Sequence, residues 1–274
     1  MDIDLHNWYK PTIDKKILKD LSKRRDWPGL LHFFIYFAAL FTSGYFAYLT
    51  WGTWWTALWF FIYGTIYSFS VANWHETVHR TAFKTRWINE VFYHISSFMC
   101  DFEGFRWRWS HTFHHTYTLQ TEGDYDHEIQ VSRPTELIWF FFNFIPFADL
   151  LYPHRLIKFE VIKHAFGFFS PVVKISAPEK EKKKILWNSR FYVLIWIFII
   201  FISIYYGTIL PILFIILPTY YGKPIWFSVN VSQHLGAAIN KKDHRQSTYT
   251  VKINPILSFL YWHMEYHLEH HMFP

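Results

Sequence analysis

The segment WHMEYHLEHHMFP, residues 262–274, contains a His-x-x-His-His box made of His267, His270 and His271. On a helix these three positions fall at roughly 0°, 300° and 40° around the axis, so the imidazoles share about 100° of arc on one face. Imidazole is a ligand for zinc, copper, nickel and iron. The box therefore predicts a metal site.

Three earlier segments carry side chains at related spacings. HTFHH (111–115) repeats the box, HETVH (75–79) places two histidines at i and i+4, and NVSQH (230–234) places an asparagine and a histidine at i and i+4. At most about four or five ligands fit around one first-row ion with an open position, so this many histidines predict two ions. The predicted ligands are His75, His79, His111, His114, His115, His234, His267, His270 and His271.

The composition places these histidines in a membrane protein. Half of the 274 residues are hydrophobic and 23% are aromatic, including 15 Trp and 30 Phe, which is typical of the aromatic belts at membrane interfaces. No charged residue occurs in residues 31–72 or in residues 191–222, which are 42 and 32 residues long. A helix needs about 20 apolar residues to cross a bilayer, so each run predicts a helical hairpin. The turns are expected near residues 50–52 and at Gly207 to Pro211.

The basic residues lie outside both runs. Seven of the 27 Lys/Arg precede the first run, fifteen lie between the runs and five follow the second. Two hairpins put these three regions on one side, which the positive-inside rule makes cytoplasmic. The net charge of +6 is thereby explained without nucleic acid. We expect Arg190 and Lys223, which flank the second hairpin, to extend their charges toward the lipid headgroups.

The predicted fold is therefore an all-α integral membrane protein. Four transmembrane helices in two hairpins carry a cytosolic helical cap with the histidine boxes. The apolar segment 137–152 is too short to span and is expected to be interfacial. The single domain, residues 1–274, divides into a basic cytosolic N-terminus (1–30), hairpin one (31–72), cap (73–190), hairpin two (191–229) and a second cap segment (230–274).

Two adjacent ions in an all-nitrogen shell beside a bilayer suit chemistry on a lipid chain. Unactivated C–H bonds need a strong oxidant, which iron and O₂ can generate, whereas zinc has no redox chemistry. The histidine spacing alone identifies no metal, so iron is inferred from the chemistry required.

The order of these boxes, the two apolar hairpins and the trailing Met272-Phe273-Pro274 resemble the membrane fatty acid desaturase and hydroxylase superfamily. The resemblance runs from about residue 31 to the end. It implies four transmembrane helices, a cytosolic di-iron centre ligated by the nine histidines, O₂ as oxidant and an external electron donor of the ferredoxin or cytochrome b5 type. By position, Asn230 matches the residue that approaches one iron through water in acyl-CoA desaturases.

Some features of the superfamily are missing from this sequence. The last box lacks the glutamine of front-end desaturases, and neither a His-Pro-Gly-Gly haem motif nor the alkane hydroxylase signature Asn-Tyr-x-Glu-His-Tyr-Gly occurs. Members usually continue for some tens of residues after the last box, so the chain is expected to be a C-terminal truncation. A fatty acyl desaturase is the first expectation; a fatty-acid or alkane hydroxylase, or a carotenoid ketolase or hydroxylase, is the alternative.

Two other interpretations of the function remain open. The motif His75-Glu76-Thr77-Val78-His79 is literally His-Glu-x-x-His, in which Glu76 would be the general base of a zinc peptidase. A metal transporter or sensor would need ionisable ligands at mid-bilayer, where only His32 is found.

Carboxylates near the boxes are expected to accept the distal N–H groups of ligand histidines. They are Glu76, Asp101, Glu103, Asp124, Asp126, Glu265 and Glu269.

Overall fold

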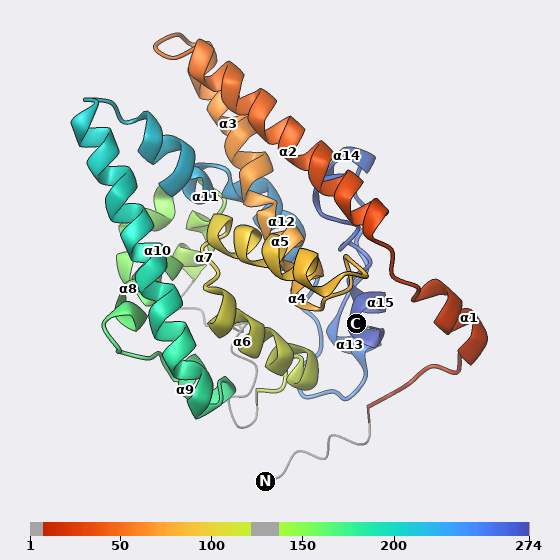
Figure 1. The fold of residues 1–274 in the computed structure, drawn as a ribbon. Helices are drawn as coiled ribbons and strands as arrows, with labels where there is room; N and C mark the ends of the chain where they lie inside the picture. Colours follow the sequence, from red (N-terminus) through yellow and green to blue (C-terminus); the bar gives the residue numbers. More distant parts are fainter. Residues whose placement is uncertain (1–7, 122–136, 274) are drawn as a thin grey trace.

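The computed structural model describes residues 8–121 and 137–273, and every regular element within these ranges is helical. Two long helices, α2 (Asp26–Leu49) and α10 (Glu179–Tyr205), each open a hairpin (Figure 1). The other α-helices are α1 (Lys15–Leu21), α3 (Trp55–Ser68), α4 (Ser70–Val78), α5 (Arg86–Met99), α6 (Gly104–Tyr117), α7 (Leu137–Phe142), α8 (Ile157–Ala165), α9 (Pro171–Ser176), α11 (Pro218–Tyr221), α12 (Lys223–Ser232), α13 (His244–Ser247), α14 (Pro255–Leu260) and α15 (His267–Met272).

The first hairpin packs α2 against α3. The chain turns at residues 50–54, where Gly52 adopts a left-handed conformation (φ +82°) that a side chain would strain. Tyr36 of α2 is fully buried, and its hydroxyl donates to the carbonyl of Ile66 at 3.0 Å. The returning arm breaks at Phe69 and continues as α4, which carries the first histidine pair away from the turn.

The return arm of the second hairpin is assembled from short pieces. After α10 the chain turns at Gly207 and passes through a π-helical turn (Ile212–Ile216), α11 and α12. Pro218 has no N–H, so the carbonyl of Phe214 loses its usual helical partner. The hydroxyl of Tyr63 on α3 donates to that carbonyl at 2.9 Å. Neighbouring polar side chains of this kind allow a broken helix to persist within a bilayer.

Two glycines let the hairpins meet. A Cβ atom on Gly222 would lie 1.9 Å from the carbonyl carbon of Gly64, and a Cβ on Gly64 would lie 2.1 Å from the ring of Tyr221. No side chain larger than hydrogen fits at either position. The backbones of α3 and the α11–α12 junction are therefore in direct contact, which fixes α12 relative to α4.

Two continuous helices in the described part of the chain are long and apolar enough to cross a membrane, α2 and α10. Their surfaces expose large apolar side chains, including Phe34, Phe41, Phe201 and Ile204, each with 59–75% of its surface accessible. Apolar exposure on this scale is typical of lipid-facing surfaces. The sequence predicts four crossings; α3 and the α11–α12 arm are shorter because of the breaks at Phe69 and Pro218, so the four-crossing topology stays a prediction.

The apolar segment 137–152 forms α7, only six residues long, followed by a 3-10 turn at Ala148–Leu151. Neither element is long enough to span. The two charges that flank the second hairpin are both bound to protein groups. Lys223 pairs with the buried Asp149, and the Arg190 Nε donates to the carbonyl of Ala165 at 3.0 Å. A carboxylate thus neutralises Lys223, and a backbone carbonyl holds the Arg190 guanidinium.

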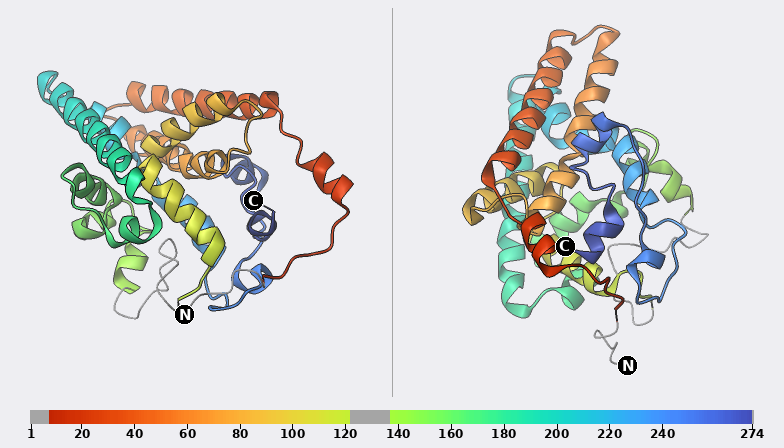
Figure 2. Two further views of the ribbon diagram at one scale, coloured as in Figure 1. Left: turned by 60° about the horizontal axis from the view of Figure 1, so that its bottom comes forward. Right: turned by 90° about the vertical axis from the view of Figure 1, so that its right-hand side faces the viewer.

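The helices that carry histidines gather away from the hairpin turns. Figure 1 shows the α2–α3 turn and the far end of α10 at the top, with α6, α13 and α15 in the lower half. The right-hand view of Figure 2 again places α15 well below the α2–α3 turn. The fold therefore separates an apolar two-hairpin end from a polar end that contains α4, α6 and α15.

Candidate metal centre

All nine histidines predicted as ligands come together in two groups. His75, His79, His111, His115 and His270 form one, in which one ring nitrogen of each lies within 4.8 Å of the others. We name this the five-histidine cluster. The four-histidine cluster meets the same distance criterion and consists of His114, His234, His267 and His271.

Each His-x-x-His-His box is divided between the two clusters. In the α6 box the outer histidines belong to the five-histidine cluster, and the middle one, His114, belongs to the four-histidine cluster. In the α15 box the division is reversed, and His270 alone joins the five-histidine cluster. Positions i and i+4 are about 40° apart on a helix, whereas i+3 lies about 60° to the other side. Each helix can thus present ligands to two neighbouring points.

The five-histidine cluster has the spacing of a shared ligand shell. The Nε2 atom of His111 lies 2.9 Å from that of His79 and 3.1 Å from that of His115, whose Nε2 lies 3.1 Å from that of His270. Two nitrogens held by bonds of about 2.1 Å at about 90° lie about 3.0 Å apart. Nε2 of His75 is buried without a hydrogen-bond partner in the described part of the chain. The arrangement fits one ion.

In the four-histidine cluster the Nε2 atoms form a similar chain. His271 Nε2 lies 3.2 Å from the Nε2 atoms of both His114 and His267, and His267 Nε2 lies 3.1 Å from that of His234. Three rings of this cluster, His114, His267 and His271, are buried, so water is largely displaced from their nitrogens.

Two rings of the four-histidine cluster have an assigned tautomer. His234 Nδ1 lies 2.8 Å from the carbonyl of Ser247, which can only accept, so this Nδ1 carries the proton. The Thr118 hydroxyl donates to the His114 carbonyl at 2.7 Å and therefore accepts from His271 Nδ1 at 3.2 Å. Such hydrogen bonds leave the Nε2 lone pair for a metal and fix the orientation of the ring.

These tautomers test whether an ion fits the cluster. His267 Nε2 can donate one proton at most, yet it lies beside the Nε2 lone pairs of both His234 and His271. At least one of these contacts is therefore between two lone pairs, which repel each other. A cation at the centre converts that repulsion into ligation, so the donor set fits a metal ion.

Burial keeps the histidines in the neutral form that binds metal. The pKa of His75 is held well below its ordinary value, first by burial and then by the neighbouring histidines. Burial likewise lowers the pKa of His79 to about 4. Because only neutral imidazole binds a metal ion, both rings are available as ligands at neutral pH.

The segment before α15 holds a strained backbone. Trp262 and His263 are consecutive residues with positive φ (53° and 56°), a conformation that costs on the order of 1–3 kcal/mol per residue outside glycine. The buried amide of Gln233, beside His234, donates to the Met264 carbonyl at 2.6 Å. This bond ties the end of α12 to the start of α15, so His234, just after α12, lies near the histidines of α15.

The N-terminus of α6 is fixed by buried charge. The Glu103 carboxylate caps the helix by accepting from the backbone N–H of Arg106 at 2.7 Å. Burial raises the pKa of Glu103 to about 7. Just before it, the buried Asp101 pairs with Lys158 of α8 and accepts from the Thr219 hydroxyl at 2.9 Å. The helix that serves both clusters is thus anchored to α8 and α11.

Asn230 lies on α12, and His234 lies in the turn just after this helix; the side-chain oxygen of Asn230 accepts from the Tyr261 hydroxyl at 3.3 Å. His32, the histidine of the charge-free run, packs its ring against Trp262 with centroids 3.7 Å apart and belongs to neither cluster. His263 has a mostly exposed side chain and also lies outside both clusters.

The carboxylates near the boxes have partners of their own. Glu76 accepts from Thr81 at 2.7 Å, Glu265 from Ser258, and Glu269 from Thr250. Asp101 and Glu103 hold α6 as described above, and Asp124 and Asp126 lie outside the described residues. The groups that fix ring tautomers, the Thr118 hydroxyl and the Ser247 carbonyl, were missed by sequence reasoning. Thr118 lies three residues after His115, the last histidine of the α6 box, and this proximity is the sequence feature that could have identified it.

The described part of the chain, which is all-helical with two membrane-length helices and two histidine clusters, defines a candidate membrane metalloprotein. A model of the family described as Fatty acid desaturase matches residues 50–274, a stretch that contains all nine histidines. The chain belongs to this family. Family membership makes the protein a membrane-associated oxidoreductase of lipid chains. The comparison with curated proteins and the comparison with solved structures each gave no significant match.

Proposed function

We propose that the protein is a di-iron fatty acyl desaturase that uses O₂ to introduce a double bond into a lipid chain. The observation that carries the proposal is the meeting of nine histidines in two clusters with ligand spacing. Five histidine nitrogens surround one centre and four surround the other, without a carboxylate in either group. Iron bound there supplies the oxidising chemistry that C–H bonds require.

The chain's own residues hold and orient the centre. The five-histidine and four-histidine clusters are proposed to bind one iron each, and Asn230 is proposed to approach the four-histidine cluster through water. The hydrogen bonds from His234 to Ser247 and from His271 to Thr118 keep two Nε2 lone pairs aimed at the centre. Electrons are proposed to come from an external donor of the ferredoxin or cytochrome b5 type.

We further propose that the protein crosses the membrane four times with both clusters on the cytoplasmic side. The support is the position of α4, α6 and α15 away from the hairpin turns and the absence of Lys/Arg from both apolar runs. With both ends of each hairpin on one side, the clusters lie just beyond the hydrocarbon, where an acyl chain can enter from the bilayer.

The rival functions account for fewer residues. In a zinc peptidase Glu76 would act on a water at His75 and His79, but its carboxylate accepts from Thr81 and its pKa is raised chiefly by burial. The other seven histidines of the two clusters would have no role in such a peptidase. For a transporter, His32 in the first hairpin would be the mid-bilayer ligand, yet its ring is engaged with Phe259 and Trp262.

The test is expression of the full chain in a host of known lipid content, followed by mass spectrometry of fatty acids and carotenoids and by metal analysis of the purified protein. Loss of two hydrogens from an acyl chain supports desaturation, and gain of one oxygen assigns hydroxylation or ketolation instead. Two equivalents of iron are expected. Their full retention in His271→Ala, with His263→Ala as the matched control, would contradict the site assignment.

A further inference from the structure

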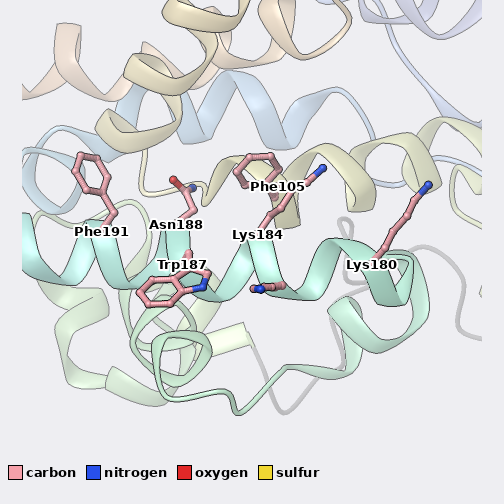
Figure 3. A pocket seen from close by; sticks show the side chains of 7 residues that line it. Phe105, Lys180, Lys184, Trp187, Asn188 and Phe191 are labelled. Carbon is pink, nitrogen blue, oxygen red and sulfur yellow. The ribbon is translucent and has the colours of Figure 1, made fainter.

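An open groove lies between α10 and the start of α6, on a different part of the surface from the histidine clusters. It measures about 550 Å³ and is lined by Phe105, Lys180, Lys183, Lys184, Trp187, Asn188 and Phe191. Small-molecule sites usually occupy about 300–1,000 Å³, so the groove can hold part of a ligand. Figure 3 shows Lys180, Lys184, Asn188 and Phe191 projecting from α10 on the side where Phe105 lies.

The lining of the groove changes from basic to aromatic along one face of α10. Lys180, Lys184, Trp187 and Phe191 occupy positions i, i+4, i+7 and i+11, which fall within about 60° of arc. The rise from the first to the last is about 16 Å. A molecule lying in the groove would therefore meet ammonium groups at one end and exposed aromatic rings at the other.

Two of the three lysines of the groove offer charge that the protein leaves uncompensated. Within the described residues, neither Lys180 nor Lys183 forms an ion pair, and both are exposed. By contrast Lys182, which does not line the groove, pairs with Glu179, and Lys184 pairs with Glu181 at 2.9 Å. The free positive charge of this part of α10 is thus concentrated in the groove.

The aromatic end of the groove coincides with the start of the membrane-length part of α10. Phe191 is the first residue of the charge-free run, and Trp187 lies one turn before it; the two side chains are 58% and 57% exposed. Trp is typical of the membrane interface. Lys184 and Lys180 follow one and two turns further from the hydrocarbon, at the depth of the headgroups and just beyond.

A second hollow continues the groove along α6. It shares Phe105 and Lys184 with the first and adds Arg80 and Arg108. Both guanidinium groups contact the Glu90 carboxylate, at 2.7 and 2.9 Å, so this carboxylate balances one of the two charges. Glu181 also lines this hollow and pairs with Lys184, so the two hollows together keep an excess of positive charge.

We propose that this groove binds an anionic phospholipid of the surrounding membrane. Its phosphate contacts Lys180, Lys183 and Lys184, and one acyl chain lies along Trp187 and Phe191. A zwitterionic lipid would bring its own positive group to the lysines, and a soluble phosphate would leave the exposed aromatic rings uncovered. The charge pattern and the depth of the groove thus favour an anionic lipid over both.

The proposal is tested by native mass spectrometry of the full-length protein in detergent, titrated with phosphatidylglycerol or phosphatidylcholine of identical acyl chains. The wild type should bind the first phosphatidylglycerol at least tenfold more tightly than phosphatidylcholine. Each lysine near an anionic headgroup contributes about fivefold, so the double variant Lys180→Gln/Lys183→Gln should weaken phosphatidylglycerol binding about twentyfold and abolish the preference. Trp187→Ala should weaken the binding of both lipids and preserve the preference for phosphatidylglycerol over phosphatidylcholine.

The matched control is Lys163→Gln/Lys174→Gln, which removes the same charge from exposed positions of α8 and α9 outside the groove. Its affinity should stay within about twofold of the wild type. The proposal is overturned by an undiminished preference in the groove variant, by an equal loss in the control, or by full displacement of the lipid by soluble glycerol 3-phosphate. Lipid binding is measured without turnover, so the result is independent of the metal centre.

Discussion

The two histidine clusters both draw on α6 and α15, yet they differ in how their rings are supported. The five-histidine cluster has one ligand more, and Nδ1 of His115 is buried without a hydrogen-bond partner in the described chain. The four-histidine cluster has fewer ligands. Two of its rings, those of His234 and His271, are oriented by hydrogen bonds, and Nδ1 of His267 is buried without a partner in the described chain. One cluster therefore relies on the number of its ligands and the other on their orientation.

This difference has a consequence for sensitivity to substitution. A cluster with five nitrogens still offers four after one is lost, whereas a cluster with four offers three. A hydrogen bond that fixes a ring matters most where each ligand is needed. The four-histidine cluster should therefore lose its metal ion more easily than the five-histidine cluster. The following changes test this contrast in order of expected effect.

The largest effect is expected from ligand removal. His234→Ala should release the ion of the four-histidine cluster, which lowers the iron content from two equivalents toward one and reduces activity by more than about a thousandfold. His79→Ala should retain more of its ion because four histidines remain. Metal analysis of the purified variants, together with acyl-chain mass spectrometry, measures both results.

His263→Ala serves as the control for this comparison, because His263 lies next to the last box and outside both clusters. It should keep both equivalents. If His79→Ala lost as much iron as His234→Ala, the four histidines that remain in the larger cluster would not be enough to retain its ion, and the proposed contrast would be wrong.

The second change should affect both clusters equally. Lys158→Ala leaves the buried Asp101 carboxylate without its cation, just ahead of the helix that serves both sites. Breaking a buried ion pair in this way costs about 3–5 kcal/mol. We expect a large fall in melting temperature and a parallel loss of iron from both clusters.

Lys182→Ala is the matched control, since its pair with Glu179 is partly solvent-exposed and such pairs contribute about 1 kcal/mol or less. Its melting temperature should stay close to that of the wild type. Selective loss of iron from one cluster in Lys158→Ala would argue against α6 as the common support.

The identity of the nine histidines could be predicted from the sequence because i, i+3 and i+4 spacing leaves little choice of face on a helix. Their division between clusters could not, because it depends on how α6 and α15 face each other. The α2–α3 turn followed from the absence of charge on both sides of Gly52. The broken return arm was harder to foresee, since it depends on a carbonyl freed by Pro218 and bound by Tyr63 from another hairpin.

The groups that orient the rings could not be predicted either. Carboxylates were expected, but a backbone carbonyl at Ser247 and the hydroxyl of Thr118 fill this role. Any residue can offer a carbonyl, so the sequence contains no signal for it. The pair of Asp101 with Lys158 joins positions 57 residues apart, and opposite charges at that separation are too common in a chain to be matched in advance.

The third change removes one orienting hydrogen bond. Thr118→Val keeps the shape of the side chain but cannot accept from His271 Nδ1. Loss of such a partner typically weakens metal affinity about 10–100-fold. The effect should be confined to the four-histidine cluster and should appear when iron is titrated with a chelator of known affinity.

Thr118→Ser, which retains the hydroxyl, should restore most of the affinity. Thr112→Val is the control, because Thr112 makes the same kind of bond to a carbonyl four residues earlier on α6 but is exposed. Equal weakening in Thr112→Val would show that the effect comes from the helix and not from the ring.

The last comparison concerns the pH dependence of stability at a buried histidine outside both clusters, which gives the baseline for the acid sensitivity of the clusters. His164 Nε2 accepts from the backbone N–H of Ser170 at 3.1 Å, and burial lowers the pKa of His164 to about 4 although Glu160 acts to raise it. Between pH 6.5 and 4 the unfolded chain takes up a proton at this ring and the folded protein does not. The stability that the neutral His164 ring contributes is therefore fully present above pH 6.5 and falls as the pH is lowered, by about 3 kcal/mol at most.

The variant His164→Gln can still accept the hydrogen bond from Ser170 and cannot be protonated. Its melting temperature should therefore fall less steeply across this pH range than that of the wild type and of Thr112→Val. Identical slopes in all three proteins would mean that acid acts elsewhere, and any steeper loss that remains in His164→Gln measures the contribution of other groups, the two clusters included.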